Sequence, residues 1–225
     1  MEKIVIIGDG EIAQIAFEYF MSDSKYLVKA FAVEKIYRKR EELFGLPVID
    51  LEDIVEKYPK ENYSVFVAIS FIDLNGVRRR IFEMVKKMGY MCVSYISSKA
   101  YCYPDVVLGE NVFVFENATI QRGVIIGDNS FIWHGAMVSH RSVIGKNCWI
   151  APACAIAGFS IIRDNCMLGI NSTILDNVVI SEDTMIGAGA VCLKDIKEKG
   201  GIYVGNPARK LAKSVYEFGG FHINS

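Results

Sequence analysis

The sequence predicts two domains of different construction: an α/β, Rossmann-like domain over residues 1–98, and a parallel β-helix with a short C-terminal helix over residues 99–225. Three observations lead to this fold class. Short apolar runs alternate with amphipathic stretches in the first part of the chain. From residue 103 onward an aliphatic residue recurs every six positions, and in the same region an asparagine recurs every eighteen.

The first 98 residues contain apolar runs of strand length, separated by stretches with a helical apolar period. Strands that alternate with helices along the chain are typical of a mainly parallel α/β sheet. We expect strands over residues 3–7, 26–33, 64–70 and 91–96, and helices over residues 12–21, 51–58 and 74–88.

The second part of the chain follows a six-residue repeat without a break. Divided into hexapeptides from Tyr103, it has Leu, Val or Ile at the sixth position fourteen times running, from Leu108 to Ile186. The fourth position holds only Val, Ala, Ser, Cys or Thr. These positions lie two residues apart, so on a strand both side chains point to the same side. A small and an aliphatic residue repeated every six positions predict a parallel β-helix with hexapeptide rungs.

A longer period predicts the shape of each coil. Asparagine recurs every eighteen residues, at positions 111, 129, 147 and 165. Three hexapeptides therefore form one triangular coil, and the asparagines mark one corner, because Asn tolerates left-handed backbone angles. Cys148, Cys154 and Cys166 fall on the small inward position, which predicts packed thiols.

The outward fifth position forms apolar stripes on two faces of the prism. One stripe consists of Phe113, Phe131, Trp149, Met167 and Met185, and the other of Val107, Ile125, Val143, Ile161 and Val179. Two such stripes exposed on a monomer would be a liability. We therefore expect prisms to pack side by side through these stripes, with Trp149 at or near the contacts, and a triangular prism favours a homotrimer.

Composition and charge exclude several classes of protein. Lys and Arg number 25 and Asp and Glu number 26, so the formal net charge of −1 gives little support for nucleic-acid binding. The N-terminus lacks a signal-peptide pattern, and no apolar run reaches the length of a membrane span. Six cysteines without a C-x-x-C pair predict reduced thiols and no metal site. We expect a cytoplasmic protein.

Four segments carry a resemblance to a known family: SHRSVIGKNCWI, GINSTILDN, IGAGAVCLKD and YVGNPARKL. They resemble left-handed β-helix acyltransferases of the sialic acid O-acetyltransferase type, and most of all the bacillosamine and perosamine N-acetyltransferases. The resemblance extends over nearly the whole chain and includes the order of the domains. It implies an N-terminal domain that binds a nucleotide-linked sugar, and acetyl-CoA bound between subunits of a trimer. It also implies that His140 takes a proton from the attacking sugar amine or hydroxyl.

His140 is the candidate catalytic residue. It occupies the second position of its hexapeptide, at or near a corner, where a side chain points out of the prism. Imidazole titrates near neutral pH and suits general-base catalysis, whereas a polar residue at a corner is the structural alternative. Gly158 lies eighteen residues on, directly above His140, and leaves space where a ligand could lie. His134 occupies the same position on the neighbouring corner but matches no catalytic position of the family.

Two residues depart from the family pattern. Arg141 stands where the family usually has an acid, which raises the basicity of the histidine and fixes its tautomer. A cation neither raises the basicity of the histidine nor accepts its N–H. Three alternatives follow: another acceptor orients His140, the reaction relies less on a strong base, or residue 141 contacts the substrate. Trp149 stands where the bacillosamine enzymes have a histidine that contacts acetyl-CoA. It either contacts the acyl donor or belongs only to the aromatic stripe.

The segment GDGEIA lies between a predicted strand and a predicted helix, where backbone amides suit a phosphate. It is only a partial G-x-G-x-x-G, and Asp9 and Glu11 would repel a pyrophosphate. We therefore expect Gly8, Asp9, Gly10 and Glu11 to contact hydroxyls of a sugar or ribose rather than a dinucleotide cofactor. Glu34, after the second strand, is a further candidate for a ribose hydroxyl or a solvated acidic residue.

Coenzyme A needs contacts for its pantetheine arm and cations for its phosphates. The backbone groups of Ile170 and Ala188 match contact positions of the family, and Arg163, Lys194 and Arg209 are the basic candidates nearby.

The leading hypothesis is an acyl-CoA-dependent transferase that acetylates the amine of a nucleotide-linked amino sugar for surface glycan biosynthesis, with His140 as general base. Acylation of a sugar hydroxyl, or transfer of an acyl group other than acetyl, is the alternative among enzymes. A noncatalytic hexapeptide scaffold is the alternative of another class, because the acid after His140 is missing. The C-terminal helix is expected over residues 207–219, from a proline at its start to a glycine near its end.

Overall fold

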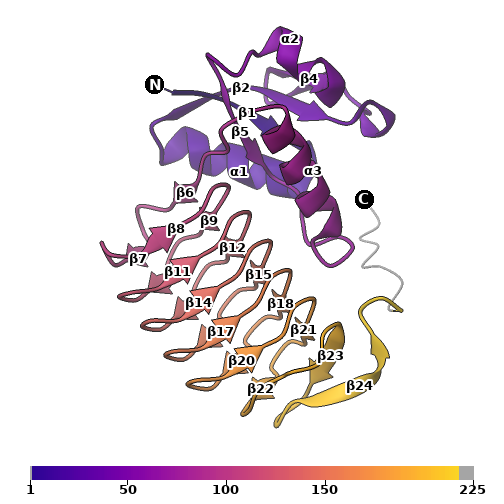
Figure 1. Cartoon of the computed structure of the whole chain (residues 1–225). Helices are drawn as coiled ribbons and strands as arrows, with labels where there is room; N and C mark the ends of the chain where they lie inside the picture. The colour runs from indigo at the N-terminus through magenta and orange to yellow at the C-terminus, as the bar shows by residue number, and fades with distance from the viewer. Residues whose placement is uncertain (1, 218–225) are drawn as a thin grey trace.

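The computed structural model describes residues 2–217, which form two domains stacked on each other (Figure 1). The N-terminal domain has a five-stranded sheet of order β3-β4-β2-β1-β5, parallel except for the β3–β4 hairpin. Its main elements are β1 (Glu2–Ile7), α1 (Glu11–Ser22), β2 (Tyr26–Val33), β3 (Glu42–Leu43), β4 (Leu46–Asp50), α2 (Ile54–Lys57), β5 (Ser64–Val67) and α3 (Gly76–Lys87). Short 3-10 segments span Lys35–Tyr37 and Leu51–Asp53.

Strand β1 shows why the sheet is buried on both faces. Ile4 and Ile6 pack in one apolar cluster with α1, whereas Val5 and Ile7 pack in another with α2 and α3. A strand covered on both sides has a continuous apolar sequence, as the segment IVII over residues 4–7 does. The expected α/β domain is confirmed, and the hairpin β3–β4 was not predicted.

Residues 91–96, expected as one strand, divide between the two domains. Cys92 forms a parallel bridge with Val65 of β5, whereas β6 (Tyr95–Ile96) pairs with a strand of the β-helix. The boundary expected between residues 98 and 99 therefore falls inside the first coil.

The C-terminal domain is a three-sided prism of parallel strands, as the six-residue repeat predicted. We call its sides the covered face, which the N-terminal domain lies against, the second face and the third face. The covered face contains β6, β9 (Phe113–Val114), β12 (Phe131–Ile132), β15 (Trp149–Ile150), β18 (Met167–Leu168), β21 (Met185–Ile186), β23 (Gly201–Val204) and β24 (Arg209–Ser214).

The second and third faces are open to solvent in the single chain. The second face contains β7 (Tyr101–Cys102), β10 (Thr119–Ile120), β13 (Met137–Val138), β16 (Ala155–Ile156), β19 (Thr173–Ile174) and β22 (Val191–Cys192). The third face contains β8 (Val107–Leu108), β11 (Ile125–Ile126), β14 (Val143–Ile144), β17 (Ile161–Ile162) and β20 (Val179–Ile180). None of the helices within residues 2–217 combines the length and the apolar sequence that a membrane span requires.

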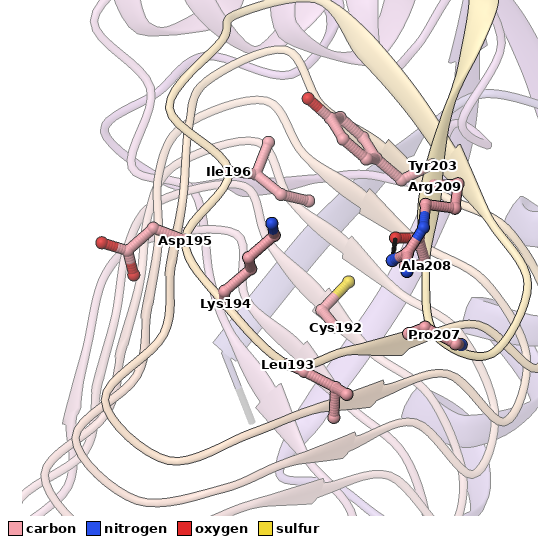
Figure 2. Close-up of a pocket in the computed structure, with 9 residues that line it drawn as sticks. All are labelled: Cys192, Leu193, Lys194, Asp195, Ile196, Tyr203, Pro207, Ala208 and Arg209. Carbon is pink, nitrogen blue, oxygen red and sulfur yellow. Dashed lines mark hydrogen bonds between the residues drawn. The ribbon is translucent and has the colours of Figure 1, made fainter.

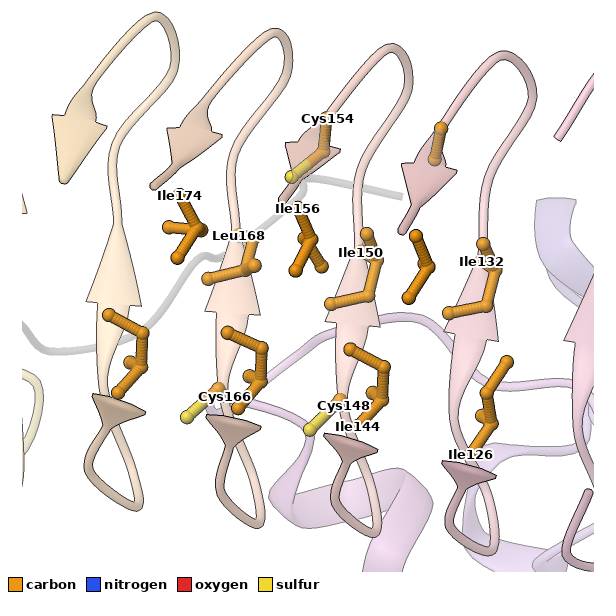
Figure 3. Packing of buried hydrophobic residues seen from close by; sticks show 14 of the residues in the cluster. Ile126, Ile132, Ile144, Cys148, Ile150, Cys154, Ile156, Cys166, Leu168 and Ile174 are labelled. Atoms are coloured by element: carbon orange, nitrogen blue, oxygen red, sulfur yellow. The ribbon is translucent and has the colours of Figure 1, made fainter. Parts of the chain in front are cut away.

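The interior of the prism is filled by the fourth and sixth positions of the repeat (Figure 3). Isoleucines stack from coil to coil, and the small fourth position leaves room for them. The cysteines on these positions are buried and unpaired, as predicted. Burial raises the pKa of Cys154 to about 12 and that of Cys192 to about 11, so both thiols are protonated at neutral pH.

The predicted asparagine column lies at one corner of the prism, in left-handed backbone conformation, with φ between 56° and 60°. The side chains form a ladder: Asn111 donates to Asn129, and Asn129 donates to Asn147, over 2.9 and 2.8 Å. The first asparagine of the ladder, Asn111, also joins the two domains. Its side-chain amide exchanges two hydrogen bonds with the backbone of Val67 at the end of β5.

The aromatic stripe lies on the covered face, beneath the N-terminal domain. Phe113 and Phe131 are fully buried and pack against Phe66, while Trp149 is only 4% exposed and packs against Phe71. The expectation that this stripe contacts a neighbouring subunit is wrong. The apolar surface that a lone prism would expose here is buried by the same chain's first domain.

Arg78 of α3 is the polar centre of this contact and is fully buried. Its guanidinium donates to the carbonyls of Ser70, Asn129, Asn147 and Cys148 over 3.2–3.3 Å, and it lies against the rings of Phe131 and Trp149. Burial lowers the pKa of Arg78 to about 9, so the group remains a cation at neutral pH.

The C-terminal helix expected over residues 207–219 is absent from its described part. Residues 209–214 instead form β24, antiparallel to β23, and residues 218 and 219 lie outside the described residues. The free edge of β23 explains the difference, because unpaired backbone groups at a sheet edge favour another strand over an isolated short helix. Ala208 N also donates to Val191 O, so this segment still caps the last coil.

Replacing Arg78 by leucine should lower the free energy of unfolding by about 3 kcal/mol or more, because buried carbonyls of both domains lose their donor. Arg78→Lys should also be destabilising, since one ammonium cannot reach all four carbonyls. Urea unfolding measures the effect, and Arg79→Leu, an exposed neighbour on α3, is the control. Equal stability of the Arg78 and Arg79 variants would contradict the assigned role.

Candidate functional site

His140 lies at the corner between the second and third faces, where β13 ends and β14 begins. The same corner position in successive coils is occupied by His140, Gly158, Asp176 and Lys194, each eighteen residues apart. We call this column and the residues beside it the histidine corner, and we call a coil that lies nearer the C-terminus the coil above. The strands on either side are in register from coil to coil, so these residues lie one above another.

The imidazole of His140 is exposed and is held by two neighbours. Gln121, one coil below, accepts a hydrogen bond from His140 N at 2.9 Å, and the same oxygen lies 3.3 Å from Nδ1. Phe159, one coil above, contacts the ring edge to face, with centroids 5.2 Å apart. The ring therefore has a defined orientation although it faces solvent.

Gly158 provides the space that the imidazole occupies. A Cβ atom at this position would lie 2.7 Å from both Cε1 and Nε2 of His140, closer than atoms can approach. The same point lies 3.3 Å from Asp176 Oδ1, which accepts a hydrogen bond from Gly158 N. The space expected above His140 for a ligand is thus partly filled by the histidine itself, with a carboxylate on its far side.

Arg141 has a left-handed backbone conformation, with φ of 56°, at the turn of the corner. Its guanidinium lies over the ring of Phe159, 5.4 Å from the centroid, and the side chain is exposed. The cation is therefore placed beside the histidine on the outer surface, within reach of a ligand bound at the corner.

The glycine turn of the N-terminal domain lies at the carboxyl end of β1, next to β2 and β5. Strand order reverses direction at β1, and ligands of open α/β sheets bind at such a point. Gly8 has φ of 121°, and a Cβ there would lie 2.8 Å from Ala68 O, so only glycine fits. Gly10 precedes α1 and has open space around its Cα, and Glu11 is exposed.

Two of the three acidic candidates of this domain have cationic partners. Asp9 lies 3.4 Å from Arg40, and Glu34 forms two hydrogen bonds of 2.7 Å with Arg80. These bonds lower the pKa of Glu34, so it is a carboxylate at neutral pH. The repulsion that the sequence predicts at this turn is therefore partly offset by arginine.

Two further candidates lie away from the histidine corner. Trp149 is buried on the covered face, on the opposite side of the prism from that corner, and we do not include it in the candidate site. His134 is exposed on the corner between the covered and second faces. Among residues 2–217, no three His, Cys, Asp or Glu side chains gather to hold a metal ion.

A cavity of about 270 Å³ lies at the C-terminal end of the prism (Figure 2). Its wall combines the last residues of the histidine corner with the turn before β24 and includes Lys194, Tyr203 and Arg209. Two of the three predicted basic residues therefore lie at one cavity on the same edge of the prism as His140.

The other donor-binding candidates occupy different corners. Ile170 and Ala188 are exposed on the corner between the covered and second faces. Arg163 is exposed on the asparagine corner, between the third and covered faces. A single chain therefore does not bring Ile170 and Ala188 together with His140.

The two halves of the candidate site are also separated. The glycine turn belongs to the domain on the covered face, whereas the histidine corner is the edge of the triangle opposite that face. Within one chain the prism lies between them.

Comparisons with known proteins agree with this fold. A family model described as the GMPPB C-terminal domain matches residues 92–199, and comparison with curated proteins gave no match. Among solved structures, PerB from Caulobacter crescentus, in complex with CoA and GDP-perosamine, has a TM-score of 0.82 and 29% identity, over 93% of this chain and 97% of that chain.

Two other solved structures have the same two-domain fold. The acetyltransferase domain of PglB from Neisseria gonorrhoeae FA1090 has a TM-score of 0.84 and 23% identity, over 94% of this chain and 100% of that chain. WeeI from Acinetobacter baumannii AYE has a TM-score of 0.79 and 24% identity, over 92% and 99%. The chain shares with these structures a left-handed β-helix behind a Rossmann-like domain.

Two residues of the histidine corner were missed by the sequence analysis, namely Gln121 and Asp176. Asp176 lies two coils above His140 in the same column, so the eighteen-residue period could have identified it. Gln121 lies nineteen residues before His140, one position off that period, and it makes contact only because its side chain reaches up to the next coil.

Replacing Gly158 by alanine should displace the imidazole of His140, since the added methyl overlaps two ring atoms. We expect a crystal structure of Gly158→Ala to show the ring rotated away from Gln121. The unfolding temperature should change little, because the exposed ring can move outward into solvent. A ring that keeps its position in the variant would contradict this account.

Proposed function

We propose that this protein is an acetyl-CoA-dependent N-acetyltransferase that acts on a nucleotide-linked amino sugar. The observation that carries the proposal is the exposed, oriented imidazole of His140 at the edge of a prism, in a chain similar over 93% of its length to PerB, whose structure contains CoA and GDP-perosamine. A second structure of that enzyme is described as a perosamine N-acetyltransferase.

The chemistry assigned to His140 is general-base catalysis. The sugar amine attacks the carbonyl carbon of the thioester, and Nε2 of His140 accepts the proton that the nitrogen loses as the new C–N bond forms. The tetrahedral intermediate then breaks its C–S bond, and the thiolate of coenzyme A takes a proton from the imidazolium. Histidine suits both steps because it is readily protonated and deprotonated near neutral pH.

The histidine corner also suits the shape of the acyl donor. Lys194 lies three coils above His140, which corresponds to about 14 Å at the usual spacing of neighbouring strands. A thioester at His140 and an extended pantetheine arm along the edge would bring the phosphates toward Lys194 and Arg209 at the terminal cavity. Lysine and arginine are the side chains that bind phosphate by charge and hydrogen bonding.

The nucleotide-linked sugar is assigned to the N-terminal domain. The turn Gly8–Glu11 lies at the reversal point of the sheet, where the amides at the start of α1 are available to a polar ligand. The carboxylates of Asp9 and Glu34 suit sugar or ribose hydroxyls, and Arg40 and Arg80 beside them supply positive charge near a diphosphate.

A homotrimer would unite the parts of the site. The glycine turn and the histidine corner lie on opposite sides of one prism, so an acceptor held by one subunit must reach the histidine of another. The stripe on the third face supports self-association: Val107, Ile125 and Ile161 are 58%, 45% and 37% exposed. A neighbouring copy would also supply Ile170 and Ala188 to a donor lying between subunits.

The reaction is assigned to the cytoplasm, as a step in surface glycan biosynthesis. All six cysteines are free, which is the state expected in a reducing compartment.

The function is tested by incubating the full chain with acetyl-CoA and a panel of GDP- and UDP-linked amino sugars, with thiol release as the readout. We expect release with at least one amino sugar and none with its hydroxyl counterpart. His140→Ala should lower turnover by roughly 10²- to 10⁴-fold, the usual effect of losing a positioned base, with coenzyme A affinity little changed.

His134→Ala is the matched control, since it removes the other corner histidine. Its kcat at saturating acetyl-CoA should equal that of the parent, although His134 lies in the same column as Ile170 and Ala188. Near-parental turnover of His140→Ala, or equal losses in the two variants, would refute the assignment of His140.

The association through the third face has its own test. Light scattering of the purified protein at micromolar concentration should give the mass of three chains. Ile125→Lys combined with Ile161→Lys should shift the mass toward one chain, because two charges are then placed in a buried apolar contact. Ile36→Lys, on the most exposed apolar residue of the N-terminal domain, should leave it unchanged. A monodisperse monomer would end the trimer proposal.

A further inference from the structure

The histidine corner contains an acceptor that the sequence pattern does not show. In hexapeptide acyltransferases that resemble this chain, an acid after the histidine is expected to orient the ring, and here that position is Arg141. Arginine has no acceptor atom and lies over Phe159 instead. The acceptor within hydrogen-bonding distance of His140 Nδ1 is the side-chain oxygen of Gln121, one coil below.

The backbone of His140 determines which end of the Gln121 amide faces the ring. A backbone N–H can only donate, and His140 N lies 2.9 Å from the amide, so the facing atom must be Oε1 rather than Nε2 of the glutamine. That oxygen lies 3.3 Å from His140 Nδ1. Two acceptors cannot share a hydrogen bond, so this contact is favourable only when Nδ1 carries the proton.

We propose that Gln121 is a positioning residue that selects the Nδ1–H tautomer of His140 and leaves the lone pair of Nε2 free for the acceptor's proton. This inference rests on the proposed function. The oxygen of Gln121 accepts from both the backbone and the ring of His140, so ring orientation and tautomer are set by one side chain. Phe159 and the gap at Gly158 restrict the ring from the other side.

The charged groups around the ring fit this arrangement. Asp176 Oδ1 lies beyond Gly158, on the side of the ring that carries Cε1 and Nε2, where a carboxylate stabilises the imidazolium once the proton has been taken. Arg141 packs on Phe159, and Arg122, one coil below, is directed toward Tyr103 and Asp105. Gln121 is neutral, so it fixes the tautomer without adding the charge that an acid would bring.

The opposite arrangement is chemically possible and makes the proposal testable. If Asp176 accepted a proton from Nε2, the ring would carry its proton there, and Nε2 would not serve as a base. Nitrogen-15 NMR of the imidazole in the full-length protein distinguishes the two tautomers, with the signals assigned by their loss in His140→Ala. We expect protonated Nδ1 in the parent protein, and a protonated Nε2 would overturn the proposal.

Two variants test the role of Gln121 itself. Gln121→Met keeps the length of the side chain but has no strong acceptor, so it should lose the tautomer preference and lower kcat by roughly 10- to 100-fold, with the KM for acetyl-CoA little changed. Gln121→Glu keeps an acceptor and adds a charge that favours the imidazolium. It should retain the tautomer and most of the turnover, and move the acid limb of the pH–rate profile to higher pH.

Glu56→Met, at an exposed position of α2 that belongs neither to the histidine corner nor to the glycine turn, is the control for the substitution. Unchanged tautomer and kcat in Gln121→Met, or an unmoved acid limb in Gln121→Glu, would overturn the proposal. The NMR measurement requires no substrate, so it tests Gln121 even if the panel of amino sugars gives no turnover. A failure of the proposed function and a failure of this inference are therefore distinguishable.

Discussion

The burial of one cation organises the contact between the two domains. Arg78 reaches from α3 into a ring of backbone carbonyls at the asparagine corner, and aromatic rings of the covered face enclose it. Asn111 adds a two-bond contact to the end of β5. These directional bonds fix where the apolar surfaces of the two domains meet, because apolar packing alone specifies position weakly. The location of the glycine turn relative to the prism follows from this contact.

Covering one face has a direct effect on chemistry. The first domain buries the face that carries the aromatic stripe, and the candidate site lies on the opposite edge of the prism. That edge presents an imidazole held by Gln121, a carboxylate two coils above it, and a lysine beside a cavity at the end of the prism. The edge is rigid because each corner belongs to strands that are paired above and below, and this rigidity orients an exposed histidine.

Much of this fold could be predicted from the sequence because the same packing requirements recur in every coil. Each rung needs a small and an aliphatic residue inside the prism, and Asn111 and its column lie at a corner with left-handed backbone angles. The period also placed His140 and Gly158 in one column. It could not say what covers an apolar stripe, so Trp149 was assigned to a subunit contact although the same chain buries it. The C-terminal segment was expected as a helix because local propensity says nothing of the free edge of β23. The contact of Gln121 with His140 could not be predicted from the eighteen-residue period, because it depends on a side chain that reaches from one coil to the next.

The stacking of identical coils gives the edge of the prism a fixed unit of length. Each coil is eighteen residues of sequence and about 4.8 Å of height, and it repeats the same corner geometry at every level. The distance from the imidazole to the terminal cavity is thus a whole number of coils. A duplication of one coil between His140 and Lys194 would lengthen that distance by one unit and leave the chemistry at both ends intact. A lineage of such proteins could therefore adjust its reach along a long substrate by simple duplication, without rebuilding either end.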